Sequence, residues 1–412
     1  MSIFLIGALG LALDGSMLYG HRQMAQSAAD AAAQGAMLSI FHGTNATATY
    51  PFATGTTPAP YTCTTTDGTT PCAYARLNGF GGLASDSVSI TYPTSVPGVN
   101  LGAGNASAMT VRVQRSVNAT LMAYFGVRSY TVAATATAAM VRFPMANCVI
   151  ALDSSANDAF SISGNANMNL TTCGIAVDSN SSSAFRANGN ISLTTTGINV
   201  VGGVNQNGNV TINPTPTTGV TPVSDPFASV PAPTPASCAP NSTINGDTTI
   251  GPGTYCGGIN ITGNSNVTFK PGTYILLGGG LSASGNVSLT GSGVTFYNTF
   301  DNTHPFDSIS LTGNLTMNLS APPGGTLAGM LFFEDRNAPT GNTEKFTGNS
   351  SSNMTGAMYF PNNEVEYTGN SSTGVQNVAI VANTVRFIGN ASLKSDPSVP
   401  GAAQQIKVAL VQ

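Results

Sequence analysis

The segment SASGNVSLTGSGVTFYNT, residues 282–299, contains two short runs in which apolar and hydroxyl side chains alternate. The runs are Val287-Ser288-Leu289 and Val294-Thr295-Phe296. A period of two places the apolar side chains on one face of a β-strand and the polar ones on the other. Gly285-Asn286 precedes the first run, and because both residue types tolerate a positive φ, we expect a sharp turn there.

The Gly-Asn dipeptide recurs ten times after residue 144. It begins at Gly164, Gly189, Gly208, Gly263, Gly285, Gly313, Gly341, Gly348, Gly369 and Gly389. Several intervals cluster, for example 22 residues from Gly263 to Gly285 and 20 from Gly369 to Gly389. A repeat of about 20 residues with short β segments is typical of a solenoid. The sequence therefore predicts a parallel β-helix over residues 144–412.

The repeated dipeptides are assigned to structural turns. The positions are Gly164, Asn165, Gly189, Asn190, Gly263, Asn264, Gly285, Asn286, Gly313, Asn314, Gly348, Asn349, Gly369, Asn370, Gly389 and Asn390. We expect the stacked asparagine amides to hydrogen-bond to one another along the coil.

A proline-rich stretch interrupts the repeats at residues 213–239. Proline cannot donate a sheet hydrogen bond, so this stretch is predicted to form an extended excursion.

The six cysteines form three pairs that are close in sequence: Cys63 with Cys72, Cys148 with Cys173, and Cys238 with Cys256. Six cysteines permit 15 pairings, so this connectivity is a hypothesis. We interpret them as disulfides of an oxidising compartment, with buried free thiols as the alternative. A bridge between Cys148 and Cys173 is expected to staple neighbouring coils at the exposed end of the solenoid, and Cys238 and Cys256 are expected to tether the exit of the excursion.

The N-terminal residues 1–42 are predicted to form one long helix. Residues 3–13 are apolar, and Met17, Met24, Ala28 and Ala31 follow at spacings near three and four. An apolar run of 11 residues is shorter than the roughly 20 that cross a bilayer, so we expect further apolar residues upstream of this start and a retained anchor.

Residues 43–143 are predicted to form an α+β domain. Ala73–Phe80 has the pattern of a short helix, and alternating runs occupy 87–92, 109–117 and 129–141. Asn118 is expected to cap a second short helix that Gly126 ends.

The N-terminal segment resembles a known family. An apolar run ends at Asp14, and Tyr19, Arg22, Gln26 and the block from Ala28 to Ala33 follow. This pattern resembles the TadE/TadG-like Flp (tight adherence) pilus assembly proteins. Four passages of the repeat region resemble TadG-type proteins: CVIALD (148–153), CGIAVDSNSSSAF (173–185), SDPFASVPAPTPASC (224–238) and FKPGTYILLGGGL (269–281).

The patterns together predict a mixed fold, with a long N-terminal α-helix, a small α+β domain and a mainly-β right-handed parallel β-helix, and the order of elements in the α+β domain resembles pilin-like folds and the membrane-proximal domain of the TadG family. The resemblance implies an inner-membrane helix with the rest of the chain outside. It also implies a bacterial cell-envelope protein, anchored in the inner membrane by its helix and otherwise periplasmic or exposed on the cell surface. The expected partners are other pilus-assembly or pilin subunits, and a surface or glycan is a further candidate ligand. Asp14, Tyr19, Arg22, Gln26 and Asp30 are the polar positions expected to mediate assembly, since an acidic residue at the edge of an apolar helix is costly unless paired. For Asp14, an alternative is that it only marks the water interface.

Composition argues against several function classes. Only 7% of the residues are charged, and the net charge of −4 comes with no basic cluster, so nucleic-acid binding is not expected. Three histidines and no CxxC pair give no zinc site of usual spacing, and we expect no cofactor.

Parallel β-helices also host carbohydrate-active enzymes, which use carboxylates that face one another at about 5 to 10 Å. The candidates are Glu334, Asp335, Arg336, Glu344 and Lys345 on a turn, Glu364 and Glu366 on one strand face, and Asp301, His304 and Asp307 in a loop. Charges on loops often carry no chemistry, so no catalytic site is assigned.

The resemblance implies a protein that assembles or presents a pilus and projects a solenoid for adhesion or subunit contact, and the lack of a convincing catalytic motif favours a non-catalytic role. Whether it is a pilus subunit, a tip adhesin or a membrane-retained factor stays open. The alternatives are a polysaccharide lyase or hydrolase and a passive surface adhesin, which has no need for the helix of residues 14–36.

Overall fold

The computed structural model describes residues 2–41, 59–99, 101, 108–239, 243–323, 326–348, 353–370, 375–376, 378–390, 393–394 and 404–411. The chain divides into two compact units. One, the helix unit, comprises Met1–Phe143 and Ile406–Gln412; the other, the parallel unit, comprises Pro144–Gln405. Asn349, one of the predicted turn residues, lies outside the described residues.

The helix unit contains a five-stranded sheet in the order β1-β2-β3-β4-β29. The strands are β1 Tyr61–Thr62, β2 Asp86–Thr91, β3 Ala108–Asn118, β4 Ser129–Pro144 and β29 Gln404–Leu410. The pairs β1–β2, β2–β3 and β3–β4 are antiparallel. Val88, Ile90, Val111 and Val113 are buried, because the period of two turns them all to the face that the helices cover.

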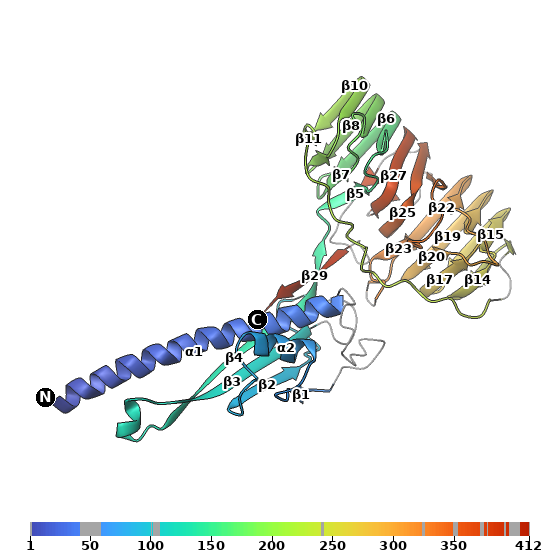
Figure 1. Ribbon diagram of the computed structural model, residues 1–412. Coiled ribbons are helices and arrows are strands. Elements are labelled where there is room, and N and C mark those ends of the chain that lie inside the picture. Colours follow the sequence, from blue (N-terminus) through green and yellow to red (C-terminus); the bar gives the residue numbers. More distant parts are fainter. Residues whose placement is uncertain are drawn as a thin grey trace. The chain divides into compact units, whose positions relative to one another are not determined.

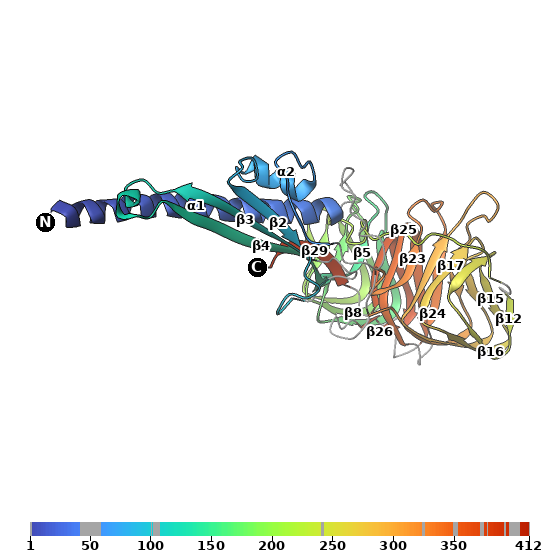
Figure 2. The same cartoon turned by 90° about the horizontal axis from the view of Figure 1, so that it is seen from below.

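One uninterrupted helix, α1, spans Ser2–Phe41, as the sequence predicted. It runs alongside β3 and β4, whereas the shorter helix α2, Thr70–Leu77, packs near its C-terminal half (Figures 1 and 2). The predicted second short helix is a single 3-10 turn, η1, Met122–Phe125, which ends at Gly126 with a φ of 91°. Of the helices described, none has the combination of length and apolar character that crossing a membrane requires.

The C-terminal strand corrects one predicted boundary. The repeat region was expected to continue to residue 412, but β29 joins β4 in the sheet of the helix unit. The parallel unit is therefore inserted between two neighbouring strands of the helix unit. Its own two ends must consequently lie close to each other.

The parallel unit is built from three columns of hydrogen-bonded parallel strands. The first column contains β5 Asn147–Ala151, β7 Gly174–Val177, β9 Ile198–Val200, β11 Thr217–Thr218, β14 Gly253–Cys256, β17 Gly272–Leu277, β20 Val294–Thr299 and β23 Met330–Glu334. The second contains β12 Thr243–Asn245, β15 Ile259–Thr262, β18 Leu281–Ala283, β21 Ser310–Leu311 and β24 Thr343–Gly348. The third contains β13 Thr248–Ile250, β16 Asn264–Phe269, β19 Asn286–Ser292, β22 Asn314–Ser320, β26 Val375–Gln376 and β28 Leu393–Lys394. The longer strands β6 Phe160–Leu170, β8 Phe185–Thr195, β10 Val204–Asn213, β25 Asn353–Asn370 and β27 Val378–Asn390 bend from one column into the next.

The strands do not follow sequence order along the columns. From one end to the other, residues 243–394 come first and residues 147–218 follow, because β27 pairs with both β5 and β6. Residues 219–239, which we call the strap, connect β11 at one end with β12–β14 at the other (Figure 1). The excursion was predicted from residue 213, but Asn213 still pairs with β8 and Thr217–Thr218 pair with β9, so the chain leaves the columns only after residue 218.

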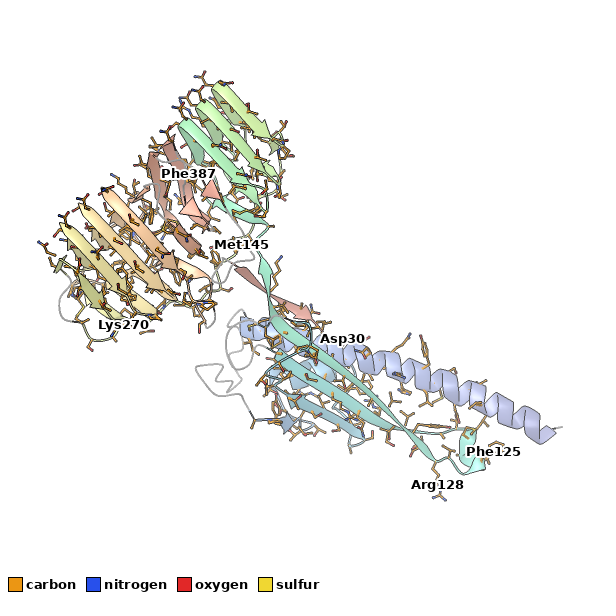
Figure 3. The ribbon with its side chains drawn as sticks, turned by 180° about the vertical axis from the view of Figure 1, so that it is seen from behind. Asp30, Phe125, Arg128, Met145, Lys270 and Phe387 are labelled. Carbon is orange, nitrogen blue, oxygen red and sulfur yellow. A yellow bond between two sulfur atoms is a disulfide. The ribbon has the colours of Figure 1, made fainter. Side chains whose placement is uncertain are left out.

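The interior of the parallel unit is a continuous apolar core. Aromatic rings from successive strands stack within it, with centroids 4.9 Å apart for Phe160 and Phe185 and 5.3 Å apart for Phe296 and Phe332. The ring centroid of Phe387, labelled on β27 in Figure 3, lies 6.0 Å from that of Phe160. Contacts of this kind join residues from the two parts of the sequence, so the core is one body.

Candidate assembly site

The alanine block of α1 is the face that packs onto the sheet. Ala25, Ala28, Ala29, Ala32, Ala33 and Ala36 are fully buried. Small side chains allow the helix axis to approach the strands closely. Gly35 extends this contact to α2, because a Cβ atom there would lie 3.0 Å from the ring of Tyr74.

Asp14 is bound inside the helix unit. Its carboxylate accepts hydrogen bonds from the backbone N–H groups of Thr120 (3.1 Å) and Met122 (2.8 Å), and from the Thr120 hydroxyl. The Thr120 hydroxyl bond, followed by the Met122 amide, lowers the pKa of Asp14 below its ordinary value of 3.8. The side chain is 3% exposed, so it is committed to the η1 turn and not displayed to a partner.

The other predicted assembly residues lie on the outer part of α1. Tyr19 is 66% exposed, and Arg22 is exposed as well. The Gln26 amide donates to Asp30 Oδ1 at 2.8 Å, a contact between neighbouring turns of one helix face. The structure therefore does not gather the five residues into one site: four are distributed along the helix surface, and Asp14 is enclosed.

A row of apolar and small residues is exposed on α1. Leu13 is 49% exposed, Met17 42%, Met24 49% and Leu38 38%. Gly20 lies between Met17 and Met24, with no atom within 4 Å of the position of a Cβ. We call these five residues the seam. Figure 3 shows Phe125 and Arg128 at the tip of the β3–β4 hairpin, beside the N-terminal half of the same helix.

All three predicted disulfides are present, and their Cα–Cα distances are 5.5 to 5.7 Å. Cys148 lies in β5, which pairs with β7 on one side and β27 on the other. The expectation that its bridge to Cys173 closes an exposed end is therefore wrong, because this bridge sits in the middle of the column. Cys238 does lie at the exit of the strap, where its backbone also pairs with that of Thr254 in an isolated parallel β-bridge.

The Gly-Asn residues line up from strand to strand. Asn190 donates to Asn165 over 2.8 Å, Asn286 to Asn264 over 3.1 Å, and Asn314 to Asn286 over 2.9 Å. Gly164, Gly189, Gly263, Gly285, Gly313 and Gly389 have φ values between 80° and 118°. Gly348 pairs with Gly369, Gly369 with Gly389, and Asn370 with Asn390. These dipeptides lie within strands or at their starts or ends, where the chain passes between columns.

The candidate catalytic residues do not form one carboxylate pair on a surface. Glu334 was expected on a turn, but it is the last residue of β23 and, like Glu344, is fully buried. Glu364 and Glu366 share a strand face as predicted, and Glu364 pairs with Arg386 at 3.1 Å. The Asp301 carboxylate accepts hydrogen bonds from Thr303 and His304 within its own loop. These bonds, of which the one from the Thr303 hydroxyl contributes most, lower the pKa of Asp301 to about 2.

Sequence reasoning missed the contacts that hold the strap. Arg336 donates to the carbonyl oxygens of Phe227 and Val230 (2.9 Å), and through Nε to the Tyr359 hydroxyl at 3.1 Å. Phe227 packs edge-on against Tyr359 with centroids 5.5 Å apart. A lone arginine after an apolar strand was the only local signal, since its partners in the strap are over 100 residues away.

Residues 1–39 match the family model described as putative Flp pilus-assembly TadE/G-like. This match supports a role of the N-terminal segment in Flp pilus assembly. No curated protein and no solved structure matches the chain.

Proposed function

We propose that this protein is a non-catalytic component of the bacterial cell envelope that assembles or presents a Flp (tight adherence) pilus. In this proposal α1 joins the protein to the inner membrane and to other pilin or assembly subunits. The parallel unit is a right-handed parallel β-helix that projects for adhesion, with a surface or glycan as ligand, or for subunit contact. The three disulfides favour the periplasm or the cell surface, where such bonds persist.

The observation that carries the proposal is the seam on α1. Its positions follow one another at intervals of four, three and four residues from Leu13 to Met24, and Leu38 continues the same seven-residue repeat. This is the spacing with which one helix packs along another. The adjoining face of α1, which includes Ala25, Ala28 and Ala32, is already buried against its own sheet, whereas the seam is exposed and available to a second helix. It also lies within the segment that matches the pilus-assembly family.

A carbohydrate-active enzyme is less favoured by the candidate residues. Glu334 and Glu344 are enclosed in the core, the Asp301 carboxylate is occupied by its own loop, and Glu364 faces Arg386. Each of these groups has a structural use already.

The proposal is tested in the native bacterium by deleting the gene and restoring a tagged full-length copy. Sheared pili and inner membranes are then assayed for the protein, and pili are counted. We expect pilus number to fall on deletion, and the protein to be found with the sheared pili or in the inner membrane. Normal pili in the deletion strain, with the protein in neither fraction, would overturn the proposal.

Seam variants make this test specific. Met17→Lys with Met24→Lys places two charges on the seam and is expected to reduce pilus assembly without unfolding the protein. Leu77→Lys with Leu83→Lys is the matched control, because these two side chains of the same unit are 81% and 55% exposed but lie outside α1. Equal effects of the seam and control variants would show that the seam has no special part.

A further inference from the structure

Two glutamates are buried in a chain that has few charges. Glu334 ends β23, Glu344 lies in β24, and neither side chain is exposed to solvent. Burying an ionised carboxylate without a cation is costly, so a buried carboxyl normally loses its charge or gains a partner. The ion pairs found among the described residues involve other groups.

Each carboxyl has one oxygen with a close hydrogen bond, and the backbone N–H of Asn362 and the side chain of Ser308 also interact with Glu334 and Glu344, respectively. Glu334 Oε1 accepts from the Asn363 side-chain amide at 2.5 Å. Glu344 Oε2 accepts from the backbone N–H of Ile309 at 2.5 Å. Nearby, the amide nitrogen of Asn298 donates to the carbonyl oxygen of Asp307 at 2.9 Å.

Three other oxygens of these side chains are buried without a hydrogen bond. Glu334 Oε2, Glu344 Oε1 and Asn298 Oδ1 are buried atoms with no hydrogen-bond partner. All three are acceptors when the carboxyls are ionised, so they cannot satisfy one another. A buried polar atom without a partner costs about 1–3 kcal/mol, which calls for an explanation.

The three side chains are neighbours. Asn298 of β20 and Glu334 of β23 are register partners on adjacent parallel strands. The Asn298 amide and the Glu344 carboxyl both bond to the short segment 307–309. The two carboxyls are also close enough for the charge of Glu344 to act on the titration of Glu334.

The charged groups around the pair are acidic. Asp335, which follows Glu334, accepts bonds from the hydroxyls of Tyr297 (3.0 Å) and Thr299 (2.6 Å), and these help to keep its carboxylate ionised. The charge of Asp335 raises the pKa of Glu334, and the charge of Asp307 raises the pKa of Glu344. Extra negative charge at this place favours the neutral form of both glutamates.

We infer that Glu344, Glu334 and Asn298 form a buried hydrogen-bonded chain held by two retained protons. The Glu344 carboxyl, protonated on Oε1, donates to Glu334 Oε2. Glu334, protonated on Oε2, donates in turn to Asn298 Oδ1. Two protons cancel both charges and give every one of the three orphan oxygens a partner. This hydrogen-bonded chain of three side chains, which we call the clasp, joins β20, β23 and β24, which are consecutive in space.

The direction of the pKa shifts agrees with this arrangement. Burial, and after it the charge of Glu344, raises the pKa of Glu334 to about 9; burial also raises the pKa of Glu344 to about 8. In the unfolded chain both titrate near 4.5, so folding takes up two protons between about pH 5 and pH 8. The stabilisation is complete below pH 4.5 and is lost as the pH rises through 8 and 9. The clasp is thus a pH-sensitive element of the fold, independent of the proposed pilus function.

Infrared spectroscopy of the full-length protein tests the inference directly. A protonated carboxyl has a C=O stretch that is separate from the carboxylate band. We expect this band at pH 7, its loss above pH 9, and a weaker band in both Glu334→Gln and Glu344→Gln. Asp178→Asn is measured alongside because burial raises the pKa of Asp178 too, and Glu366→Gln is the control at a partly exposed carboxyl.

Stability provides a second readout. The denaturant midpoint of the natural protein should fall between pH 6 and pH 9, and each glutamine variant should flatten this dependence. If neither variant changes the band at pH 7, the two carboxyls are ionised and the inference is wrong. If a chelator lowers the midpoint at pH 7, a metal ion and not protons neutralises the pair, which also overturns it.

Discussion

The Tyr359 hydroxyl donates a hydrogen bond to Asp225 Oδ2 at 2.7 Å, although 134 residues separate them in sequence. Asp225 belongs to the strap, and Tyr359 lies in β25, fully buried. The same hydroxyl accepts from Arg336 Nε. One phenol oxygen therefore fixes the strap to the strands beneath it.

Tyr359→Phe should loosen the strap while leaving the aromatic packing in place. Two hydrogen bonds to a buried hydroxyl disappear, and Asp225 and Arg336 lose a partner, so the parallel unit should lose about 1–3 kcal/mol. Urea unfolding and limited proteolysis within residues 219–239 measure the effect. Tyr124→Phe is the control, since Tyr124 is 88% exposed and its change should stay within about 0.5 kcal/mol. Equal protease resistance of both variants would contradict the assigned role.

Gly189→Ala should be strongly destabilising. Gly189 has a φ of 118°, and a Cβ atom would lie 2.3 Å from the carbonyl oxygen of Gly164 in the adjacent strand. Backbone strain alone costs about 1–3 kcal/mol, and the steric clash adds to it. Gly197→Ala is the comparison, because no atom lies within 4 Å of its Cβ position. Chemical denaturation of the two variants decides the point; similar midpoints would show that the column tolerates side chains at these bends.

Removing the Asp14 carboxylate should free the η1 turn. In Asp14→Ala the amides of Thr120 and Met122 lose their acceptor, so their hydrogen exchange should become faster. Asp30→Ala, on the same helix, should leave those two amides unchanged. Because the pKa of Asp14 is lowered, its bonds stabilise the fold above its ordinary value of 3.8 and are lost as the pH falls further. Protection of Thr120 that survives in Asp14→Ala would show that the contact is incidental.

The bridge between Cys148 and Cys173 closes a loop of 25 residues. Replacing both cysteines by serine should cost about 3 kcal/mol, since the unfolded chain regains the freedom that the loop removed. The measurable result is faster hydrogen exchange in β5 and β7. The corresponding change at Cys63 and Cys72 lies in the other unit and should leave β5 and β7 as they were.

Local patterns predicted the local features. The periodicity of residues 3–36 predicted α1, the alternation around Val287 and Val294 predicted β19 and β20, and the spacing of the cysteines predicted all three bridges. In each case the information lies within one repeat or one loop of sequence, where side-chain period and chain closure determine the result.

Features that depend on distant partners were not predicted. β29 alternates like any other strand, and nothing in its own residues says that its neighbour is β4, more than 250 residues earlier. The strand order of the parallel unit was not predicted for the same reason. Its strands present similar edges, so the sequence does not say which strand pairs with which. Glu334 was placed on a turn since carboxylates are usually solvated; its enclosure depends on Asn298, Asn363 and Glu344, which only the fold brings together.

The insertion of the parallel unit between β4 and β29 has a mechanical consequence. The chain enters at β5 and leaves after β28, and the strands at this point, β5, β6 and β27, belong to the middle of the columns. A pull transmitted from the helix unit is therefore applied to the middle, where the ladder between β5 and β27 and the Cys148–Cys173 bridge resist it. The outermost strands, β10 and β12, carry no tension from either connection. These end strands can therefore keep their pairing while the load passes through the ladder between β5 and β27.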